Sequence, residues 1–252
     1  MENFNLIIGI HSIICALKNP ERTIHRIVGT EDALDEIRKS VNLTNISTDM
    51  FASHKVQEEA KKYFRDLDLE YHRVPSGVFL IASELPILDI SELYSAIRSP
   101  KKLKILCLDQ ITDVHNAAAI VRTANFYGVD YIIAPGKRSF GLTPSFFRIA
   151  SGAAEYIKIV GVAKLPKTIA KLKELGVECL ALSEHAKGKL SHDLVNSEAN
   201  ICLILGREDV GISNAVLRLV DNHIALESMG ETKSLNVSIA AAVTLEKCFG
   251  KK

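Results

Sequence analysis

The chain has 252 residues, of which 47% are apolar and 24% are charged, and its mean hydropathy is +0.13. This composition is typical of a folded protein with one large or two modest domains, and it excludes a disordered or fibrous chain. The formal net charge is only +1. Residues 1–100 hold 11 basic and 15 acidic side chains, whereas residues 101–252 hold 20 and 15. A polyanion-binding site would therefore rest on local patches, mainly in the second part.

We expect neither a membrane-spanning segment nor a secretion signal at the start of the chain. Its longest apolar run, residues 6–10, is far shorter than the roughly 20 residues of a membrane-spanning helix. Glu2 stands where a secretory signal carries positive charge, so we expect a cytoplasmic protein. The five cysteines show no C-x-x-C pattern of a metal or redox site, and we expect reduced, mostly buried thiols and no bound metal.

Residues 1–82 predict a small α/β domain. Helices are expected at 9–17, 30–39 and 58–67, and strands at 25–29 and 78–82. The second helix has the clearest signal, because Thr30 is a good N-cap residue, acids follow in the first turn and bases end the last turn. Residues 83–102 are polar, with prolines around a short helical stretch, and are expected to form a linker.

From Leu103 the pattern alternates between strands and helices. Strands are expected at 103–108, 131–134, 156–160, 178–182, 201–205 and 223–226, with helices at 116–127, 145–154, 166–175, 213–220 and 235–249. Most of the strands are continuous apolar runs, which is typical of strands buried on both faces. The pattern predicts an α/β fold with a parallel sheet, in which ligands bind beyond the carboxyl ends of the strands.

Three strand-to-helix loops carry polar residues suited to chemistry. The loop 205–213 has the glycine spacing of a phosphate-binding loop at Gly206 and Gly211, but Ile212-Ser213 follow where a lysine is required, so we do not expect a nucleotide triphosphatase. The two glycines permit a close backbone approach or a tight turn. The loop 227–236 leads into a helix that Ser234 or Asn236 can cap.

The loop 109–116 places Asn116 six residues before Arg122. On one straight helix these residues do not share a face, so they converge only if Asn116 lies in the cap. Arg122 stands among apolar residues on a helix expected to be mostly buried, where it needs an anionic partner. Glu208 in a structural ion pair and a substrate phosphate are the two candidates.

Taken together, the three loops contain a recognisable set of motifs. They read Asp113-Val-His-Asn116, Arg122-Thr-Ala124 and Phe126-Tyr-Gly128; then Leu205-Gly206, Glu208 and Gly211; then Met229-Gly230 and Ser234-Leu-Asn-Val-Ser238. In this order and spacing, across residues 103–250, the sequence resembles the SpoU (TrmH-like) branch of the SPOUT methyltransferases. Asp209 and Glu227-Ser228 depart from the family pattern, where glycine and Pro-Met are common.

The resemblance implies an RNA 2′-O-ribose methyltransferase that works as a homodimer. It implies a catalytic domain over residues 103–252, with residues of about 200–250 threaded into a deep trefoil knot. It implies S-adenosylmethionine bound by Leu205, Gly206, Leu226, Met229, Ser234, Leu235 and Asn236. Arg122 corresponds to the family's catalytic arginine, with Asn116 and Glu208 as its neighbours.

The first region is similar to the small domain that precedes the catalytic domain in ribosomal RNA members of the family. The similar residues are Ile8-Gly-Ile-His11, Ala16-Leu17 and Asn19-Pro20. The resemblance implies a fold like ribosomal protein L30e over residues 1–82 and a guanosine of 23S rRNA as the substrate. RNA-binding candidates are Arg138 and Arg148 in the catalytic domain and Lys18, Arg22 and Arg26 in the small one. A tRNA 2′-O-methyltransferase and a catalytically silent RNA-binding ribosome-assembly factor are the alternatives.

Overall fold

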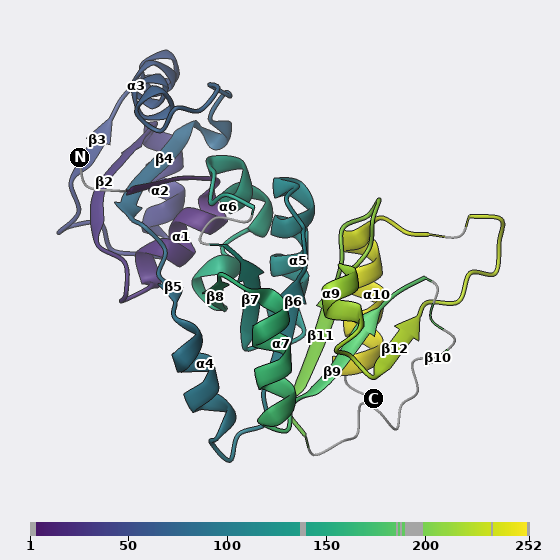
Figure 1. Cartoon of the computed structure of the whole chain (residues 1–252). Coiled ribbons are helices and arrows are strands. Elements are labelled where there is room, and N and C mark those ends of the chain that lie inside the picture. Colours follow the sequence, from purple (N-terminus) through teal and green to yellow (C-terminus); the bar gives the residue numbers. More distant parts are fainter. Residues whose placement is uncertain are drawn as a thin grey trace. The chain divides into compact units, whose positions relative to one another are not determined.

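The computed structural model describes residues 4–136, 140–184, 186, 188–189, 199–232 and 234–250 (Figure 1). The chain forms two compact units. Unit 1 contains residues 1–86 and 142–156, and unit 2 contains residues 87–141 and 157–252.

Unit 1 is built on a four-stranded sheet. The strands are β1 (Phe4–Ile8), β2 (Ile24–Gly29), β3 (Thr48–Met50) and β4 (Val78–Ser83), in the order β1-β4-β2-β3. Strand β4 pairs antiparallel with both β1 and β2, and β2 pairs parallel with β3. The helices are α1 (Ile10–Lys18), α2 (Glu31–Arg38), α3 (Ser53–Asp66) and α6 (Pro144–Ala150), with short 3-10 turns η1 (Pro75–Gly77) and η2 (Ala153–Glu155). The apolar core lies between the sheet and α3, where Val56, Phe64 and Phe79 are buried.

The helix predicted at 30–39 is confirmed as α2, and its local causes are visible. Thr30 occupies the N-cap position with extended backbone angles, Glu31 and Asp32 lie in the first turn, and Arg38 lies in the last. These charges complement the positive and negative ends of the helix dipole. The buried side chains of α2 lie on one face of the helix, and one of them, Leu34, lies beside Gly29 of β2.

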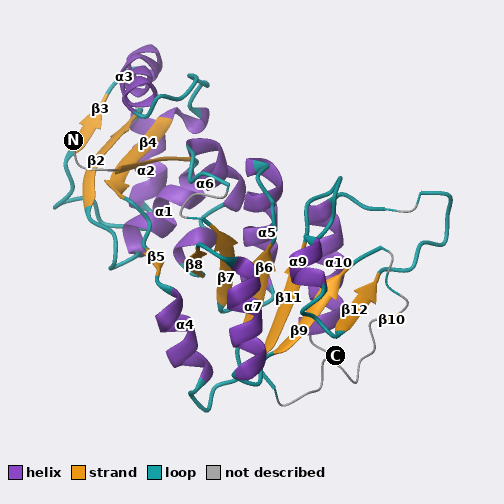
Figure 2. Ribbon diagram, in the orientation of Figure 1, coloured by secondary structure: helices purple, strands orange, loops and turns teal. Residues whose placement is uncertain are grey.

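Unit 2 contains one parallel sheet of eight strands (Figure 2). The strands are β5 (Ile87–Leu88), β6 (Lys104–Leu108), β7 (Tyr131–Pro135), β8 (Lys158–Val162), β9 (Glu178–Leu182), β10 (Gly188–Lys189), β11 (Ile201–Leu205) and β12 (Asn222–Ala225). Their order is β10-β12-β9-β11-β6-β7-β8-β5, and each neighbouring pair is parallel. The predicted α/β class and parallel sheet are therefore confirmed.

In the described part of unit 2, the helices are α4 (Ile90–Ile97), α5 (Val114–Phe126), α7 (Leu165–Glu174), α9 (Asn214–Leu217) and α10 (Val237–Phe249). Helix α10 packs against α5. Asn236 and Asn116 are hydrogen-bonded at the first turns of the two helices. At the other end, Glu246 near the end of α10 is bonded to Tyr127, which ends α5, and this contact raises the pKa of the Tyr127 hydroxyl. The two helices therefore run side by side in the same direction.

The structure divides the chain differently from the expected boundaries at two places. The expected linker 83–102 contains β5 and α4, and both belong to unit 2. The segment 142–156, expected inside the catalytic domain, belongs to unit 1. It is also not one continuous helix, because Ser151 and Gly152 adopt left-handed backbone angles and separate α6 from η2.

The cysteines agree with the expectation of free, mostly buried thiols. All five are unpaired; Cys107, Cys179, Cys202 and Cys248 are buried, and Cys15 is half-buried. Burial raises the pKa of the Cys248 thiol to about 11, so this group stays protonated at neutral pH. No helix in the described part of the chain is both long and apolar enough to cross a membrane.

Candidate functional site

The three polar loops meet at the side chain of Asn236. Its Nδ2 donates to Oδ1 of Asn116 at 3.0 Å and to Oε2 of Glu208 at 3.0 Å. Asn116 follows β6, Glu208 follows β11 and Asn236 precedes α10, so one side-chain amide connects three segments that are far apart in the sequence. Sequence reasoning named all three residues, but it did not predict that Asn236 joins them.

The other end of the Asn236 side chain caps α10, as predicted. Its Oδ1 accepts hydrogen bonds from the backbone N–H of Ser238 at 2.9 Å and from the Ser238 hydroxyl at 2.6 Å. An N-cap oxygen satisfies one of the helix's unpaired amides. Both ends of this amide are therefore engaged, which fixes its orientation.

Asn116 lies in the first turn of α5, where Asp113 positions it. Asp113 is the N-cap residue, and its Oδ1 accepts a hydrogen bond from the Asn116 backbone N–H at 2.7 Å. Asn116 is therefore the third residue of α5 and not its cap, so the condition for Asn116 and Arg122 to converge is not met. Its side chain is free to point away from the α5 backbone and toward Asn236.

The loop after β11 is closed by a backbone contact that requires glycine. Arg207 and Gly211 exchange hydrogen bonds of 3.1 and 2.8 Å, and Gly211 has a φ of 70°. A Cβ on Gly206 would overlap the carbonyl carbon of Gly211 and the amide nitrogen of Ile212. The close backbone approach is therefore the reason for glycine at position 206.

Sequence reasoning missed the role of Asp109 in holding this loop. Asp109 follows β6, is only 4% exposed, and its Oδ2 accepts a hydrogen bond from the Ser213 backbone N–H at 2.8 Å. The available signal was a carboxylate placed directly after a buried strand, since such a group needs a partner. Asp109 thus links the first polar loop to the end of the second.

The expectation of a buried Arg122 is wrong. Arg122 is exposed, and in the described ranges no hydrogen bond or ion pair engages its guanidinium, from Glu208 or any other group. The reason is that α5 buries only one side, formed by Ala117, Ala118, Ile120, Val121 and Ala124. Arg122 lies on the other side with Phe126, which is 79% exposed. The guanidinium is therefore available to an anionic ligand.

The residues expected to hold the cofactor lie at strand ends and beyond them. Leu205 ends β11 and is buried, and Leu226 follows β12 and is half-buried. Ser234 and Leu235 are exposed directly before Asn236, and Met229 is 94% exposed. Apolar side chains as exposed as Met229 and Leu235, at 49%, are the kind that a bound ligand covers.

Asp209, one of the two places where the sequence departs from the SpoU family pattern, has a local explanation. The Asp209 carboxylate accepts a hydrogen bond from Nε of Arg207 at 2.5 Å, and this contact lowers the pKa of Asp209. Its charge is thereby paired within the loop. Glu227 is exposed and follows Leu226 at the start of the third loop.

The RNA-binding candidates separate into four groups. Lys18 and Arg148 are exposed, whereas Arg26 is half-buried, bonded to Asp49 at 2.6 Å and to the Tyr63 hydroxyl, contacts that raise the pKa of Arg26. The prediction that Arg22 binds RNA is wrong, because the side chain of Arg22 is fully buried. Arg138 lies outside the described residues.

Arg22 is buried because it forms an ion pair with a carboxylate far along the sequence. Its Nη2 and Nε contact the two oxygens of Glu155 at 2.9 and 3.0 Å, and its Nη1 donates to Asn5 Oδ1 at 2.9 Å and to the Ser83 carbonyl. Asn19 supplies a further hydrogen bond to Glu155 at 2.8 Å. This bidentate pair ties η2 to the N-terminal sheet within unit 1.

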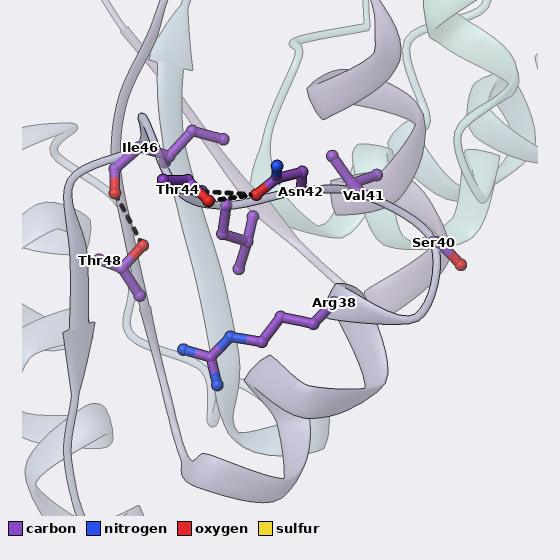
Figure 3. Close-up of a pocket in the computed structure, with 8 residues that line it drawn as sticks. Arg38, Ser40, Val41, Asn42, Thr44, Ile46 and Thr48 are labelled. Carbon is purple, nitrogen blue, oxygen red and sulfur yellow. Dashed lines mark hydrogen bonds between the residues drawn. The ribbon is translucent and has the colours of Figure 1, made fainter.

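A solvent-open depression of about 740 Å³ lies in unit 1, after α2 (Figure 3). Its lining includes Arg38, Asn42, Thr44 and Thr48. Asn42 Oδ1 accepts from the Thr44 amide and hydroxyl at 2.9 and 2.5 Å, and Arg38 pairs with Asp35 at 2.7 Å. Because these polar groups satisfy one another, the depression does not compete with the three loops as a reactive site.

Comparison with known proteins agrees with this geometry. The sequence model of the SpoU rRNA methylase family matches residues 104–246. Two relatives are named 23S rRNA (guanosine-2′-O-)-methyltransferase RlmB. The protein from Acinetobacter baylyi is 30% identical over 95% of each chain. The protein from Ralstonia nicotianae is 30% identical over 97% of this chain and 95% of the relative.

A solved structure has a similar fold. It is the SpoU methyltransferase AviRb from Streptomyces viridochromogenes in complex with the cofactor AdoMet, with a TM-score of 0.72 and 19% identity, covering 97% of this chain and 88% of that one. At this identity the likeness concerns the fold. The family match covers more than half of the chain and includes all three polar loops. The chain therefore belongs to the SpoU rRNA methylase family.

Proposed function

We propose that this chain is an S-adenosylmethionine-dependent RNA 2′-O-ribose methyltransferase that modifies a guanosine of 23S rRNA. The observation that carries the proposal is the junction of Asn116, Glu208 and Asn236 in a family member whose exposed Arg122 has no partner in the described part of the chain. Relatives matched over 95% of their length, and named for this reaction, support the choice of RNA.

The residues around the three polar loops suit the binding of S-adenosylmethionine. Leu226, Met229 and Leu235 supply apolar surface for an adenine ring, and the turn at Gly206 brings backbone groups close together. Leu205, Ser234 and Asn236 complete the proposed contacts. When bound, the cofactor supplies an electrophilic methyl group on sulfur.

Arg122 has the chemistry needed for the acceptor. A ribose 2′-hydroxyl is a weak nucleophile, and it develops negative charge as the methyl bond forms. A guanidinium stays protonated in proteins, so it is a poor general base, but it can hold an alkoxide and an adjacent phosphate with paired hydrogen bonds. We infer that Arg122 stabilises the developing alkoxide, while the proton leaves through that phosphate or through water.

Asn116 and Glu208 act through Asn236 in this proposal. They hold its amide and thereby fix the loop 226–236 beside α5. Methyl transfer is an in-line displacement, so a fixed loop that orients the donor contributes to the rate.

Asn236→Asp is expected to lower the rate of methyl transfer about 100-fold with little loss of stability. Aspartate is a good N-cap residue and keeps the contacts to Ser238, but it cannot donate to Asn116 and places a second carboxylate beside Glu208. Asn236→Ala loses the cap as well, so it should also unfold about 1 kcal/mol more easily. Methyl-transfer kinetics and urea titrations separate the two effects, and full activity in the aspartate variant would refute the junction's role.

Three further assignments belong to the same proposal. Residues of about 200–250 are threaded as a trefoil knot, as in the SPOUT family. Unit 1 is an RNA-binding unit with a fold like that of ribosomal protein L30e, and unit 2 is the catalytic unit. An enzyme acting on ribosomal RNA works in the cytoplasm, where that RNA is assembled.

The active form is proposed to be a homodimer that uses the exposed face of α5 and α10. Phe126, Leu235, Ile239 and Val243 are 79%, 49%, 53% and 36% exposed. Apolar side chains gathered on adjoining helices mark an interface. We assign them to a second copy because the face includes Arg122, one turn before Phe126, so a second copy would adjoin the reactive group.

Ile239→Arg is expected to raise the dimer dissociation constant by at least about 30-fold, because a buried unpaired charge opposes association. Ile87→Arg is the matched control, since Ile87 is 37% exposed on β5 at the other end of the sheet from β12. Sedimentation velocity measures both. A wild-type chain that stays monomeric at all concentrations would contradict the homodimer.

The test of the function is transfer of tritium from labelled S-adenosylmethionine to total RNA, followed by separation of the RNAs by size. Label in 23S rRNA supports the proposal. Label in tRNA supports the tRNA enzyme, and no label in any RNA supports the silent assembly factor. Partial alkaline hydrolysis then identifies the nucleotide, because a 2′-O-methyl group blocks cleavage.

A further inference from the structure

Unit 1 presents an exposed aromatic ring that the proposed chemistry does not use. Tyr156 is 60% exposed, and it ends the segment 142–156 that packs with the N-terminal residues. An aromatic ring held in solvent has a large flat face that is available to a ligand.

The position of this ring is fixed by contacts of α1 with α6 (Figure 1) and with η2. The Ser12 hydroxyl donates to the Phe147 carbonyl at 2.6 Å. Gly152, with a φ of 84°, lies so close to α1 that an added Cβ would meet Cys15 Cβ at 2.7 Å. The Tyr156 hydroxyl lies beside the Cys15 side chain, which raises the pKa of Tyr156. These contacts fix the position of the Tyr156 ring against α1.

Cationic side chains lie on either side of the ring along α1. Lys18 is exposed in the last turn. Arg148 is exposed beside Gly9 at the other end, where an added Cβ would meet Arg148 Cγ at 3.6 Å. His11, Cys15 and Lys18 are spaced by four and three residues, so they share one face of the helix over about 10 Å. Because Tyr156 contacts the middle residue of this row, it lies between Arg148 and Lys18.

No carboxylate on these two segments competes for an anion. Residues 10–18 contain no acid, and residues 144–156 contain only Glu155. The Glu155 side chain is 1% exposed, and Arg22 and Asn19 occupy its oxygens. The segments α1, α6 and η2 themselves thus expose cations and no carboxylate, although Glu21 is exposed just after Lys18.

We propose that Tyr156, flanked by Lys18 and Arg148, forms a binding strip for a single-stranded segment of the RNA substrate, with one base stacked on the Tyr156 ring and backbone phosphates on the two cations. Unpaired RNA is recognised by stacking on aromatic rings and by cations along its backbone, whereas a duplex hides its base faces. His11, exposed between the two ends, adds a further polar or stacking group. The identity of the polymer rests on the proposed function; the strip itself is argued from unit 1.

The test is fluorescence anisotropy with a short labelled single-stranded RNA of mixed sequence, and with the same RNA as a duplex, over a range of salt concentrations. Tyr156→Ala is expected to weaken single-strand binding about 10-fold without changing the salt dependence. Lys18→Gln and Arg148→Gln should each lower the slope of log affinity against log salt by about 0.7. Tyr156→Phe keeps the ring and loses the Cys15 contact, so it should bind within about twofold of wild type.

Lys39→Gln is the matched control, because Lys39 is an exposed lysine that ends α2 and not α1, and its ammonium is paired with Glu36. It should change neither affinity nor salt slope. The proposed strip is contradicted if Tyr156→Ala binds the single-stranded RNA as tightly as wild type, or if Tyr156→Phe loses as much affinity as Tyr156→Ala. It is also contradicted if wild type binds the duplex as tightly as the single strand. The binding assay needs no catalysis, so its result is independent of the tritium experiment. If RNA becomes labelled but Tyr156→Ala binds as wild type does, the strip is refuted and the proposed function is not.

Discussion

Arg122→Lys is expected to lower the rate of methyl transfer by about 10²–10³-fold while S-adenosylmethionine binding is retained. A lysine keeps the positive charge but presents a point donor, so it cannot hold an alkoxide and a phosphate with paired, coplanar hydrogen bonds. Removing one donor that stabilises a developing oxyanion has an effect of this size in other enzymes. Single-turnover transfer of labelled methyl to RNA measures the rate, and calorimetry measures cofactor affinity.

The exposure of Arg122 makes this experiment interpretable. Because the side chain is exposed and has no partner in the described part of the chain, its replacement should change the free energy of unfolding by less than about 0.5 kcal/mol. Arg218→Lys is a suitable control, since Arg218 is exposed at the end of α9 in the same unit. A near-normal rate in Arg122→Lys would mean that charge alone suffices, and the paired contact would then be the wrong mechanism.

The parallel sheet was predictable because its central strands are short apolar runs buried on both faces. β6, β7 and β11 match the predicted 103–108, 131–134 and 201–205 within about one residue. β5 was missed, since two residues beside Pro86 give no periodicity. β1 was missed because its apolar run continues directly into α1, so local pattern alone does not separate them.

Within the candidate site, residue identity was predictable and environment was not. Asn116, Glu208 and Asn236 could be named, but Asn236 as the shared donor depends on how three distant loops fold together. Arg122 was expected to be buried because its neighbours are apolar. Alanine fits either face of a helix, however, so an alanine-rich stretch does not reveal which side is covered.

Non-local pairing also explains why Arg22 was predicted to be an RNA ligand. Nothing near it in the sequence shows that Glu155, 133 residues away, occupies its guanidinium. That pairing brings the segment 142–156 into unit 1, although residues 104–246 match the family's catalytic model. One unit is therefore assembled from two separate parts of the chain.

Arg22→Met is accordingly expected to destabilise unit 1 by about 3–5 kcal/mol, because it leaves the Glu155 carboxylate buried without its cation. Arg22→Met combined with Glu155→Gln should lose less than the single variant, since no unpaired charge remains. Arg26→Met is the matched control: it removes an arginine ion pair from β2, four residues further along the chain, but Arg26 and Asp49 are 31% and 34% exposed, so the loss should be about 1 kcal/mol or less.

Hydrogen exchange resolves where the loss falls. Faster exchange in β1, β4 and η2, with unchanged protection in β6 and β11, is the expected pattern, because the pair joins only elements of unit 1. Arg22 bonds to Asn5 and Ser83 as well as to Glu155, so all three elements lose an anchor together. If Arg22→Met costs no more stability than Arg26→Met, the ion pair does not hold the segment 142–156 in unit 1, and the position of Tyr156 must then depend on the other contacts of this segment, such as those of Ser12, Cys15 and Gly152.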